Sequence, residues 1–158
     1  KIEWNTGLVP RGCDQELIGL MKTSGCSLVI IGDLVVDAFD SQDLASRLDQ
    51  MLQVCRLCEE CGLAYAVGQT FGAPGETRDT VDQKLDFLRR IDPAVANLRV
   101  GIRMLPGSKS ADQARSEGQV FSDGDLLQPA FYVADSVKDW IVDHLQTEAS
   151  RNPAWSID

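Results

Sequence analysis

Apolar residues along this chain follow two spacings in turn, which indicates strands followed by helices. Strand-like apolar runs begin near Ile2, Ser27, Ala64 and Asn97. After each of the first three runs, apolar residues recur every three or four positions, as on one face of an amphipathic helix. Strands that alternate with helices in this way are typical of a parallel sheet with crossover helices. The pattern therefore predicts an α/β fold with about four parallel strands.

Local signals place the boundaries of three crossover helices. Asp14 can cap the first helix, and Gly25 can end it. The second helix is expected to run from Ser41 to Gly62, because leucines recur on one face between these residues. Thr77 can cap the third helix. Each cap agrees with the apolar spacing that follows it.

The last part of the chain departs from this repeat. Residues Leu98–Leu105 are expected to form the fourth strand, and an amphipathic helix is expected from Asp135 to about Glu148. We therefore divide the chain into residues 1–132, which carry the repeat, and residues 133–158, a helical tail that packs on it.

Composition narrows the class of protein. The chain has 158 residues, of which 44% are hydrophobic and 25% charged, as expected of one soluble domain. A net charge of −9 argues against a nucleic-acid partner, since such binding depends on clustered Lys and Arg. No apolar run is long enough to cross a membrane. Five cysteines, an odd number, fit a reducing compartment, so we expect a cytoplasmic protein.

The segment from Gly72 to Thr77 is the most distinctive loop. Pro74-Gly75 suits a type II turn, and free N–H groups at the start of the next helix can attract an anion. The loop lacks the Lys-Ser/Thr pair of a P-loop and is not GxGxxG. By itself it is compatible with an anion site or with an ordinary turn.

Three cysteines at three-residue steps, Cys55, Cys58 and Cys61, raise the question of a metal site. On a straight helix such steps rotate each thiol by about 60° and separate the outer two by roughly 9 Å. Cys55 also continues a leucine stripe, which favours buried structural thiols. A metal-binding or partner-binding module that uses these cysteines remains the alternative. A fourth ligand would come from Cys13, Cys26 or His144.

Two further features bear on function. Arg103 lies within an apolar run, and a buried guanidinium needs a carboxylate or a polar ligand. Asp33, beyond the end of the second strand, is one candidate partner, so a salt bridge and a ligand contact both stay open. The first strand would expose an open edge, which invites pairing with preceding sequence or with a second copy in a homodimer.

Several blocks in order resemble the second half of radical S-adenosylmethionine (radical SAM) enzymes. The resemblance runs from Lys1 to about Tyr132 and is closest to the iron–sulfur oxidoreductases, some of which carry cobalamin domains. The blocks are 61–63, 71–77, 80–81, 85–88, 92–93, 101–107, 117–118, 126–129 and 131–132.

The resemblance implies a partial parallel β/α barrel of which residues 1–132 are the C-terminal half. The cluster-binding CxxxCxxC would follow a strand absent from this chain, so this chain would bind no cluster and would be inactive alone, with no catalytic residue. A longer parent protein would use SAM and a [4Fe-4S] cluster. It would cleave SAM reductively to start radical chemistry on an unknown substrate, with the missing N-terminal half as partner.

The resemblance also implies positions that contact SAM. Here Leu34, Val35 and Val36 replace a stretch that is polar in the family, so a degenerate, non-catalytic barrel is an alternative. The implied cofactor-binding residues are Asp33, Gln69, Gly72, Gly75, Arg103, Met104 and Leu105.

Overall fold

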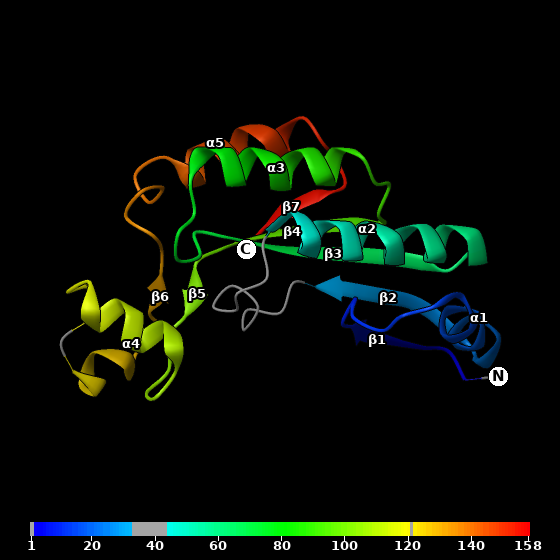
Figure 1. Cartoon of the computed structure of the whole chain (residues 1–158), viewed down its shortest axis with the longest axis horizontal. Helices are drawn as coiled ribbons and strands as arrows, with labels where there is room; N and C mark the ends of the chain where they lie inside the picture. Colours follow the sequence, from blue (N-terminus) through cyan, green and yellow to red (C-terminus); the bar gives the residue numbers. More distant parts are fainter. Residues whose placement is uncertain (1, 33–43, 121) are drawn as a thin grey trace.

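A five-stranded parallel sheet forms the centre of the computed structural model, which describes residues 2–32, 44–120 and 122–158 (Figure 1). The strand order is β1-β2-β3-β4-β7. The predicted α/β fold with parallel strands and crossover helices is confirmed. The strands are β1 (Trp4–Leu8), β2 (Cys26–Gly32), β3 (Ala64–Phe71), β4 (Val95–Val100) and β7 (Trp155–Ile157).

Helices cover one side of this sheet. Helix α2 packs against β2 and β3, α3 packs beside α2, and α5 packs against β4 and β7. Helix α1 contacts β2 and α2. None of the helices in the described part of the chain is long and apolar enough to cross a membrane. The helices are α1 (Gln15–Ser24), α2 (Leu44–Cys61), α3 (Arg78–Arg89) and α5 (Ile141–Ser150).

The predicted caps are confirmed at two helices. The Asp14 carboxylate accepts a hydrogen bond from the Leu17 N–H at 2.8 Å, and Gly25 ends α1 with φ 112°. Thr77 caps α3 and exchanges side-chain and backbone hydrogen bonds with Thr80. The start expected for the second helix, Ser41, lies outside the described residues.

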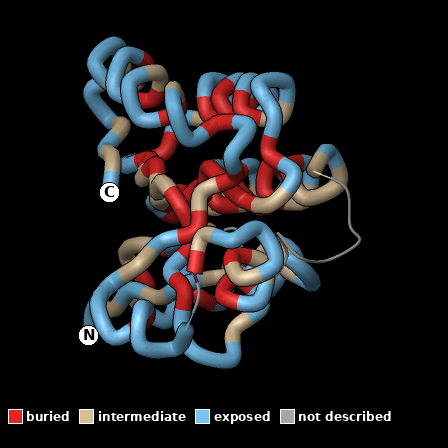
Figure 2. The backbone as a smooth tube through the Cα atoms, turned by 90° about the vertical axis from the view of Figure 1, so that its left-hand side faces the viewer, coloured by how far each residue is buried: buried red, intermediate tan, exposed pale blue. Residues whose placement is uncertain are grey.

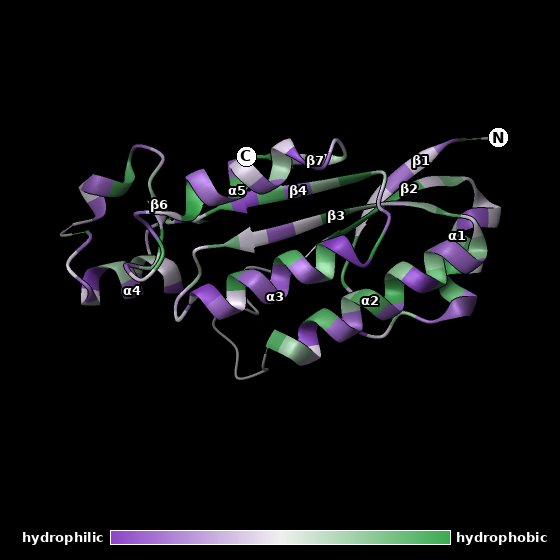
Figure 3. Ribbon diagram, turned by 90° about the horizontal axis from the view of Figure 1, so that it is seen from above, coloured by the Kyte–Doolittle hydropathy of each residue, from purple (hydrophilic) through white to green (hydrophobic). Residues whose placement is uncertain are grey.

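The core lies between the sheet and the helices. Figure 2 shows buried residues gathered in the strands and on one side of the helices, and Figure 3 shows apolar and polar residues alternating along the helical ribbons. Burial of the apolar side chains between the sheet and the helices supplies the main driving force for folding. The largest buried side chains include Ile31, Phe71, Leu85, Leu88, Leu98, Ile141 and Leu145.

The fourth strand is shorter than predicted. It ends at Val100, because Gly101 adopts φ +83° and turns the chain out of the main sheet. A Cβ at Gly101 would lie 3.0 Å from the Tyr132 carbonyl oxygen, so only glycine fits this crossing. The fourth strand is therefore present, but its expected bounds, Leu98–Leu105, are wrong, because the strand runs from Val95 to Val100.

Beyond Gly101 the chain forms a small unit outside the main sheet (Figure 1). Its strands β5 (Ile102–Arg103) and β6 (Phe131–Tyr132) pair antiparallel. Between them in the sequence lie α4 (Lys109–Ser116), which packs against β6, and a 3₁₀ turn, η2 (Asp123–Leu126).

The C-terminal tail also differs from the prediction. Helix α5 starts at Ile141 rather than Asp135, and the chain then returns as β7. Strand β7 lies parallel to β4, with Leu98 opposite Ile157. The tail therefore contributes a fifth strand to the main sheet as well as a helix.

Candidate functional site

A hollow of about 640 Å³, the face hollow, lies on the side of the sheet that the helices leave open. Alternate residues of the strands form its wall, because successive side chains of a strand point to opposite faces. Ile30 and Val95 are 45% and 44% exposed there, although both are apolar. The lining includes Leu28, Ile30, Gly68, Val95, Asn97, Arg99 and Asp158.

Polar groups gather at the β4 and β7 side of the face hollow. The Asn97 amide donates a hydrogen bond to an Asp158 carboxylate oxygen at 2.5 Å. The Arg99 guanidinium lies over Gly68, where a Cβ would come within 3.2 Å of an Arg99 nitrogen. Glycine at position 68 therefore provides the space that the Arg99 side chain occupies.

A second hollow of about 420 Å³, the edge hollow, lies at the carboxyl ends of β3 and β4. Arg99 and Asp158 line both hollows, so the two adjoin. The carboxyl ends of parallel strands are where β/α folds place their chemistry. The edge hollow adds the Thr70 side of β3, Arg103 and the half-exposed ring of Phe131 to its lining.

The loop after β3 is closed by its own carboxylate. Glu76 is 4% exposed, and its Oε2 accepts the Gly72 N–H at 3.1 Å. Its Oε1 accepts the Thr80 hydroxyl at 2.5 Å. The Glu76 carboxylate thus takes the position that an external anion would need, which favours the interpretation of this segment as a structural turn.

A buried lysine ties this loop to β3. Lys84 Nζ lies 2.5 Å from Glu76 Oε2 and donates to the Thr70 carbonyl oxygen at 2.9 Å. The Ser136 hydroxyl donates to the Glu76 carbonyl oxygen at 2.5 Å. Gly72 has φ +85°, and its carbonyl accepts the Ala134 N–H at 2.9 Å. These bonds fix the carboxyl end of β3 between α3 and the segment that precedes α5.

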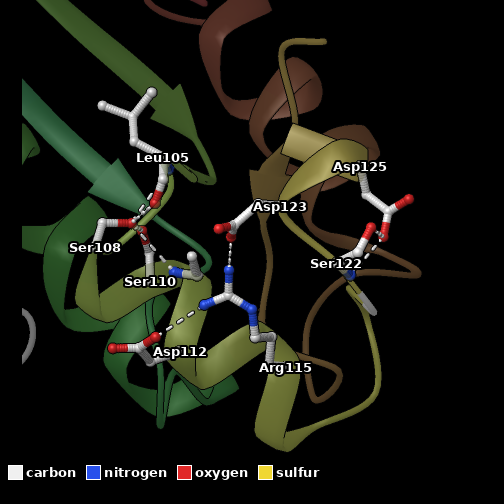
Figure 4. A network of polar contacts seen from close by, with 9 residues as sticks. Leu105, Ser108, Ser110, Asp112, Arg115, Ser122, Asp123 and Asp125 are labelled. Atoms are coloured by element: carbon white, nitrogen blue, oxygen red, sulfur yellow. Dashed lines mark hydrogen bonds and ion pairs between the residues drawn. The ribbon is translucent and has the colours of Figure 1, made fainter. Parts of the chain in front are cut away.

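A polar network holds the small unit that carries Arg103 (Figure 4). The Ser108 hydroxyl caps α4 and bonds both backbone groups of Leu105. Arg115 donates to Asp112 at 2.9 Å and also pairs with Asp123, which joins α4 to η2. Ser122 and Asp125 bond each other within η2. The unit is therefore braced on the side away from the main sheet.

The structure separates the predicted SAM contacts. Asp33 lies outside the described residues. Gln69 is 2% exposed and shares the helix-facing side of β3 with Phe71, so its neighbour Thr70 lines the edge hollow instead. Gly75 lies at an exposed turn with φ +75°. Neither hollow is lined by Gln69, Gly72 or Gly75.

Arg103 is exposed, so the expectation of a buried guanidinium is wrong. The physical reason is the turn at Gly101, which takes Arg103 out of the main sheet and places it beside the edge hollow. Met104 is 4% exposed, and its N–H donates to the Ala130 carbonyl oxygen at 2.9 Å. Leu105 is 51% exposed, and its N–H donates to the Ser108 hydroxyl. Among the six described positions, Arg103 alone lines either hollow.

The cysteines of α2 do not form a metal site in the described structure. Cys55 and Cys58 are fully buried, and burial is the main cause that raises their pKa, to about 12 and about 11 respectively. Within residues 2–32, 44–120 and 122–158, no group of three or more His, Cys, Asp or Glu side chains could hold a metal ion. These residues therefore do not fit a [4Fe-4S] cluster.

His144 has a structural environment. Its ring packs edge-to-face on Trp140, with ring centroids 5.5 Å apart. Its Nε2 lies 3.9 Å from Asp82 Oδ1, beyond hydrogen-bond distance. His144 lines neither hollow, so its contacts in the described structure are packing contacts.

Comparison with known proteins shows which proteins this chain resembles. No protein-family model matches the chain. Over 105 residues the chain is 29% identical to a tryptophan 2-C-methyltransferase of Streptomyces laurentii. This match covers 61% of this chain and 18% of the relative. The chain also matches two structures of TsrM, a radical SAM methyltransferase of Kitasatospora setae, at 25% identity and a TM-score of 0.59. The match covers 72% of this chain and 22% or 23% of TsrM.

One TsrM structure contains cobalamin and a [4Fe-4S] cluster, and the other contains tryptophan and a SAM analogue. The fold of this chain is a partial parallel β/α fold of the kind found in that enzyme. The chain is related to the cobalamin-associated branch of the radical SAM proteins. It spans about a fifth of the length of these relatives.

Proposed function

We propose that this chain forms the SAM-facing wall of a longer radical SAM protein, in which another segment binds the [4Fe-4S] cluster. The observation that carries this proposal is the edge hollow, which lies at the carboxyl ends of β3 and β4 in a fold related to a SAM-using enzyme. The lack of a cluster-binding group in the described residues supports a cluster site elsewhere. This assignment gives the chain a binding and orienting role.

The lining of the edge hollow suits the parts of SAM. Phe131 is 54% exposed and offers an aromatic face for the adenine ring. The Thr70 hydroxyl and the Asp158 carboxylate are acceptors for ribose hydroxyls. Arg103 supplies a cation for the SAM carboxylate. The Met104 and Leu105 N–H groups already have partners, so we propose side-chain contacts in this stretch rather than contacts from these donors.

The reaction of the parent protein is a choice between two chemistries. When bound, SAM supplies either a 5′-deoxyadenosyl radical, after reductive cleavage, or an electrophilic methyl group. The similarity to methyltransferases supports methyl transfer. Reductive cleavage is the alternative that the wider family suggests. In both cases the residues of this chain orient SAM, and no proton transfer is assigned to them.

Product analysis distinguishes these reactions. The full-length protein would be reconstituted anaerobically with iron, sulfide and cobalamin and incubated with SAM, a reductant and tryptophan as a trial acceptor. S-adenosylhomocysteine with a methylated acceptor would support methyl transfer, and 5′-deoxyadenosine would support reductive cleavage. This chain alone is expected to form neither product. Turnover of SAM by the isolated chain would overturn the proposed division of roles.

The outer edge of β1 supports a proposed place for the rest of the protein. Among the described residues, β1 pairs with β2 and no strand covers its other edge. An uncovered edge is a template for further strands. We expect strands of the N-terminal half to pair there. Light scattering measures the oligomeric state of the full-length protein and of this chain alone. A monomeric full-length protein together with a homodimer of this chain would be consistent with that arrangement.

A further inference from the structure

The helical layer stops short of β1. Leu8 of β1 pairs with Ile31 of β2, and residues paired in this way face the same side of a sheet. Ile31 is 0% exposed, because α1 and α2 cover β2. On β1 the residues of this side are Trp4, Thr6 and Leu8, and all three are only partly buried. The helical side of β1 therefore keeps apolar surface that no described helix covers.

Helix α1 exposes two leucines on one flank. Leu17 and Leu20 are 39% and 59% exposed. The Lys22 ammonium group donates to the Gly62 carbonyl oxygen at 2.7 Å, just beyond the end of α2, so Lys22 marks the flank of α1 that faces α2. Leu17 and Leu20 lie about 140° and 160° round the helix from Lys22. They therefore belong to the flank that faces away from α2.

The exposed flank of α1 and the helical side of β1 form one apolar surface. Helix α1 packs beside α2 and against β2 (Figure 3), so its far flank lies on the β1 side of the sheet. We name the surface of Trp4, Leu8, Leu17 and Leu20 the β1–α1 strip. It borders the outer edge of β1, which no strand of the described residues covers. A partner that completes both features offers a strand edge and an apolar helix face together.

We propose that the β1–α1 strip is the docking surface for a crossover helix of the longer protein, and that the strand before this helix pairs in parallel with the outer edge of β1. Crossovers between parallel strands are right-handed, which places such a helix on the same side of the sheet as α1 and α2. The chain spans about a fifth of the length of its relatives, so the rest of such a protein can supply this unit. This inference rests on the proposed function, which supplies the longer protein, and adds the helix and the residues that receive it.

The residues of the strip define the helix face that docks. Leu17 and Leu20 are three positions apart and form a ridge, which packs against apolar residues at three- and four-residue steps on a facing helix. Glu16 is exposed and lies about 40° beyond Leu20 on the outer flank. A Lys or Arg at the rim of the docked helix would face this carboxylate. A second copy of this chain also carries a net charge of −9, and the resulting repulsion disfavours it as the occupant.

Thiol labelling at an introduced cysteine tests the docking. Leu20→Cys is made in the full-length protein and in this chain, and labelling by N-ethylmaleimide is followed at that residue by tandem mass spectrometry. Val142→Cys is the matched control, because Val142 is also an apolar helical residue and is 42% exposed on α5. In this chain alone both thiols are expected to react at similar rates. In the full-length protein Leu20→Cys is expected to react about tenfold more slowly and the control at its former rate, because a thiol under a docked helix reacts only when the interface opens.

A charged variant links the helix to the strand without a thiol. Leu20→Glu is expected to leave this chain folded, because the position is exposed. In the full-length protein it places a charge under the docked helix, so deuterium uptake by the peptide that contains β1 is expected to rise toward that of the chain alone. Val142→Glu is the control and is expected to leave this uptake unchanged.

Two results would overturn the inference. One is labelling of Leu20→Cys that is no slower in the full-length protein than in this chain, or that slows only as much as the control does. The other is slow labelling in this chain alone that speeds up on dilution, which would assign the strip to a second copy. SAM, cobalamin and cluster play no part in these assays. A protected strip with a failed product analysis would remove the radical SAM role and leave the docking surface, and the reverse result would remove only the docking surface.

Discussion

The ion pair between Lys84 and Glu76 gives the sharpest stability prediction. Lys84 Nζ and Glu76 Oε2 lie 2.5 Å apart, and their side chains are 5% and 2% exposed. Lys84 also donates to the Thr70 carbonyl oxygen. The change Lys84→Met keeps most of the buried hydrocarbon but leaves a carboxylate without its cation in the protein interior.

The expected cost follows from this burial. Removing one partner of a buried pair costs about 3–5 kcal/mol, because the remaining charge stays desolvated. A domain of this size is stable by about 5–15 kcal/mol, so the loss is a large part of the total. The double change Lys84→Met with Glu76→Gln removes both charges. It is expected to be more stable than Lys84→Met alone.

Urea unfolding followed by circular dichroism measures this loss. Lys138→Met is the matched control, because Lys138 pairs with Asp135 on the surface, where the two side chains are 51% and 64% exposed. The control is expected to leave the urea midpoint unchanged. A loss below about 1 kcal/mol for Lys84→Met, or a double variant no more stable than the single one, would refute the argument from burial.

Three further predictions follow from the same structure. Gly72→Ala should lower the free energy of unfolding by about 1–3 kcal/mol in urea titration, since φ is +85° and a Cβ would lie 2.9 Å from a valine methyl group. Burial, and then a hydrogen bond to Glu117, raises the pKa of Tyr132 to about 12, so the stability that its neutral form contributes is present below pH 10 and is lost as pH rises toward 12. Tyr132→Phe should therefore make the free energy of unfolding less dependent on pH between these values. An unchanged slope of unfolding free energy against pH would contradict this. Cys55 and Cys58 should react with a thiol reagent at neutral pH only after unfolding, because burial raises their pKa; fast labelling of both in the native chain would count against it.

Local signals in the sequence were sufficient for much of the fold. The caps at Asp14 and Thr77 form as predicted because each bond spans only three residues. Gly25 ends α1 for a similarly local reason, its positive φ. The order of strands and helices followed from periodicity, which reflects one buried face per element.

Other parts of the fold depend on contacts between distant residues. Strand β7 is only Trp155–Ile157, too short to show a period, and it exists because β4 offers an edge. The turn at Gly101 is set by its approach to Tyr132, which is far away in the sequence. Likewise, the inward position of Glu76 depends on Lys84. Such contacts leave no local pattern to read.

Part of the candidate site could have been predicted from the alternation of buried and less buried residues along β4. Asn97 and Arg99 alternate with the buried Ala96 and Leu98, so their shared open face could have been predicted from a period of two. The same rule would have favoured Thr70 over Gln69. Asp158 could not be found, because its place depends on β7.

The central claim is that this chain lines the SAM site of a longer radical SAM protein. The dissociation constant of SAM for the reconstituted full-length protein tests it most directly, with Arg103→Ala and Phe131→Ala compared with the exposed control Arg56→Ala. We predict about tenfold weaker binding for the first two variants and unchanged binding for the control. SAM affinity that is unchanged in all three variants would contradict the claim.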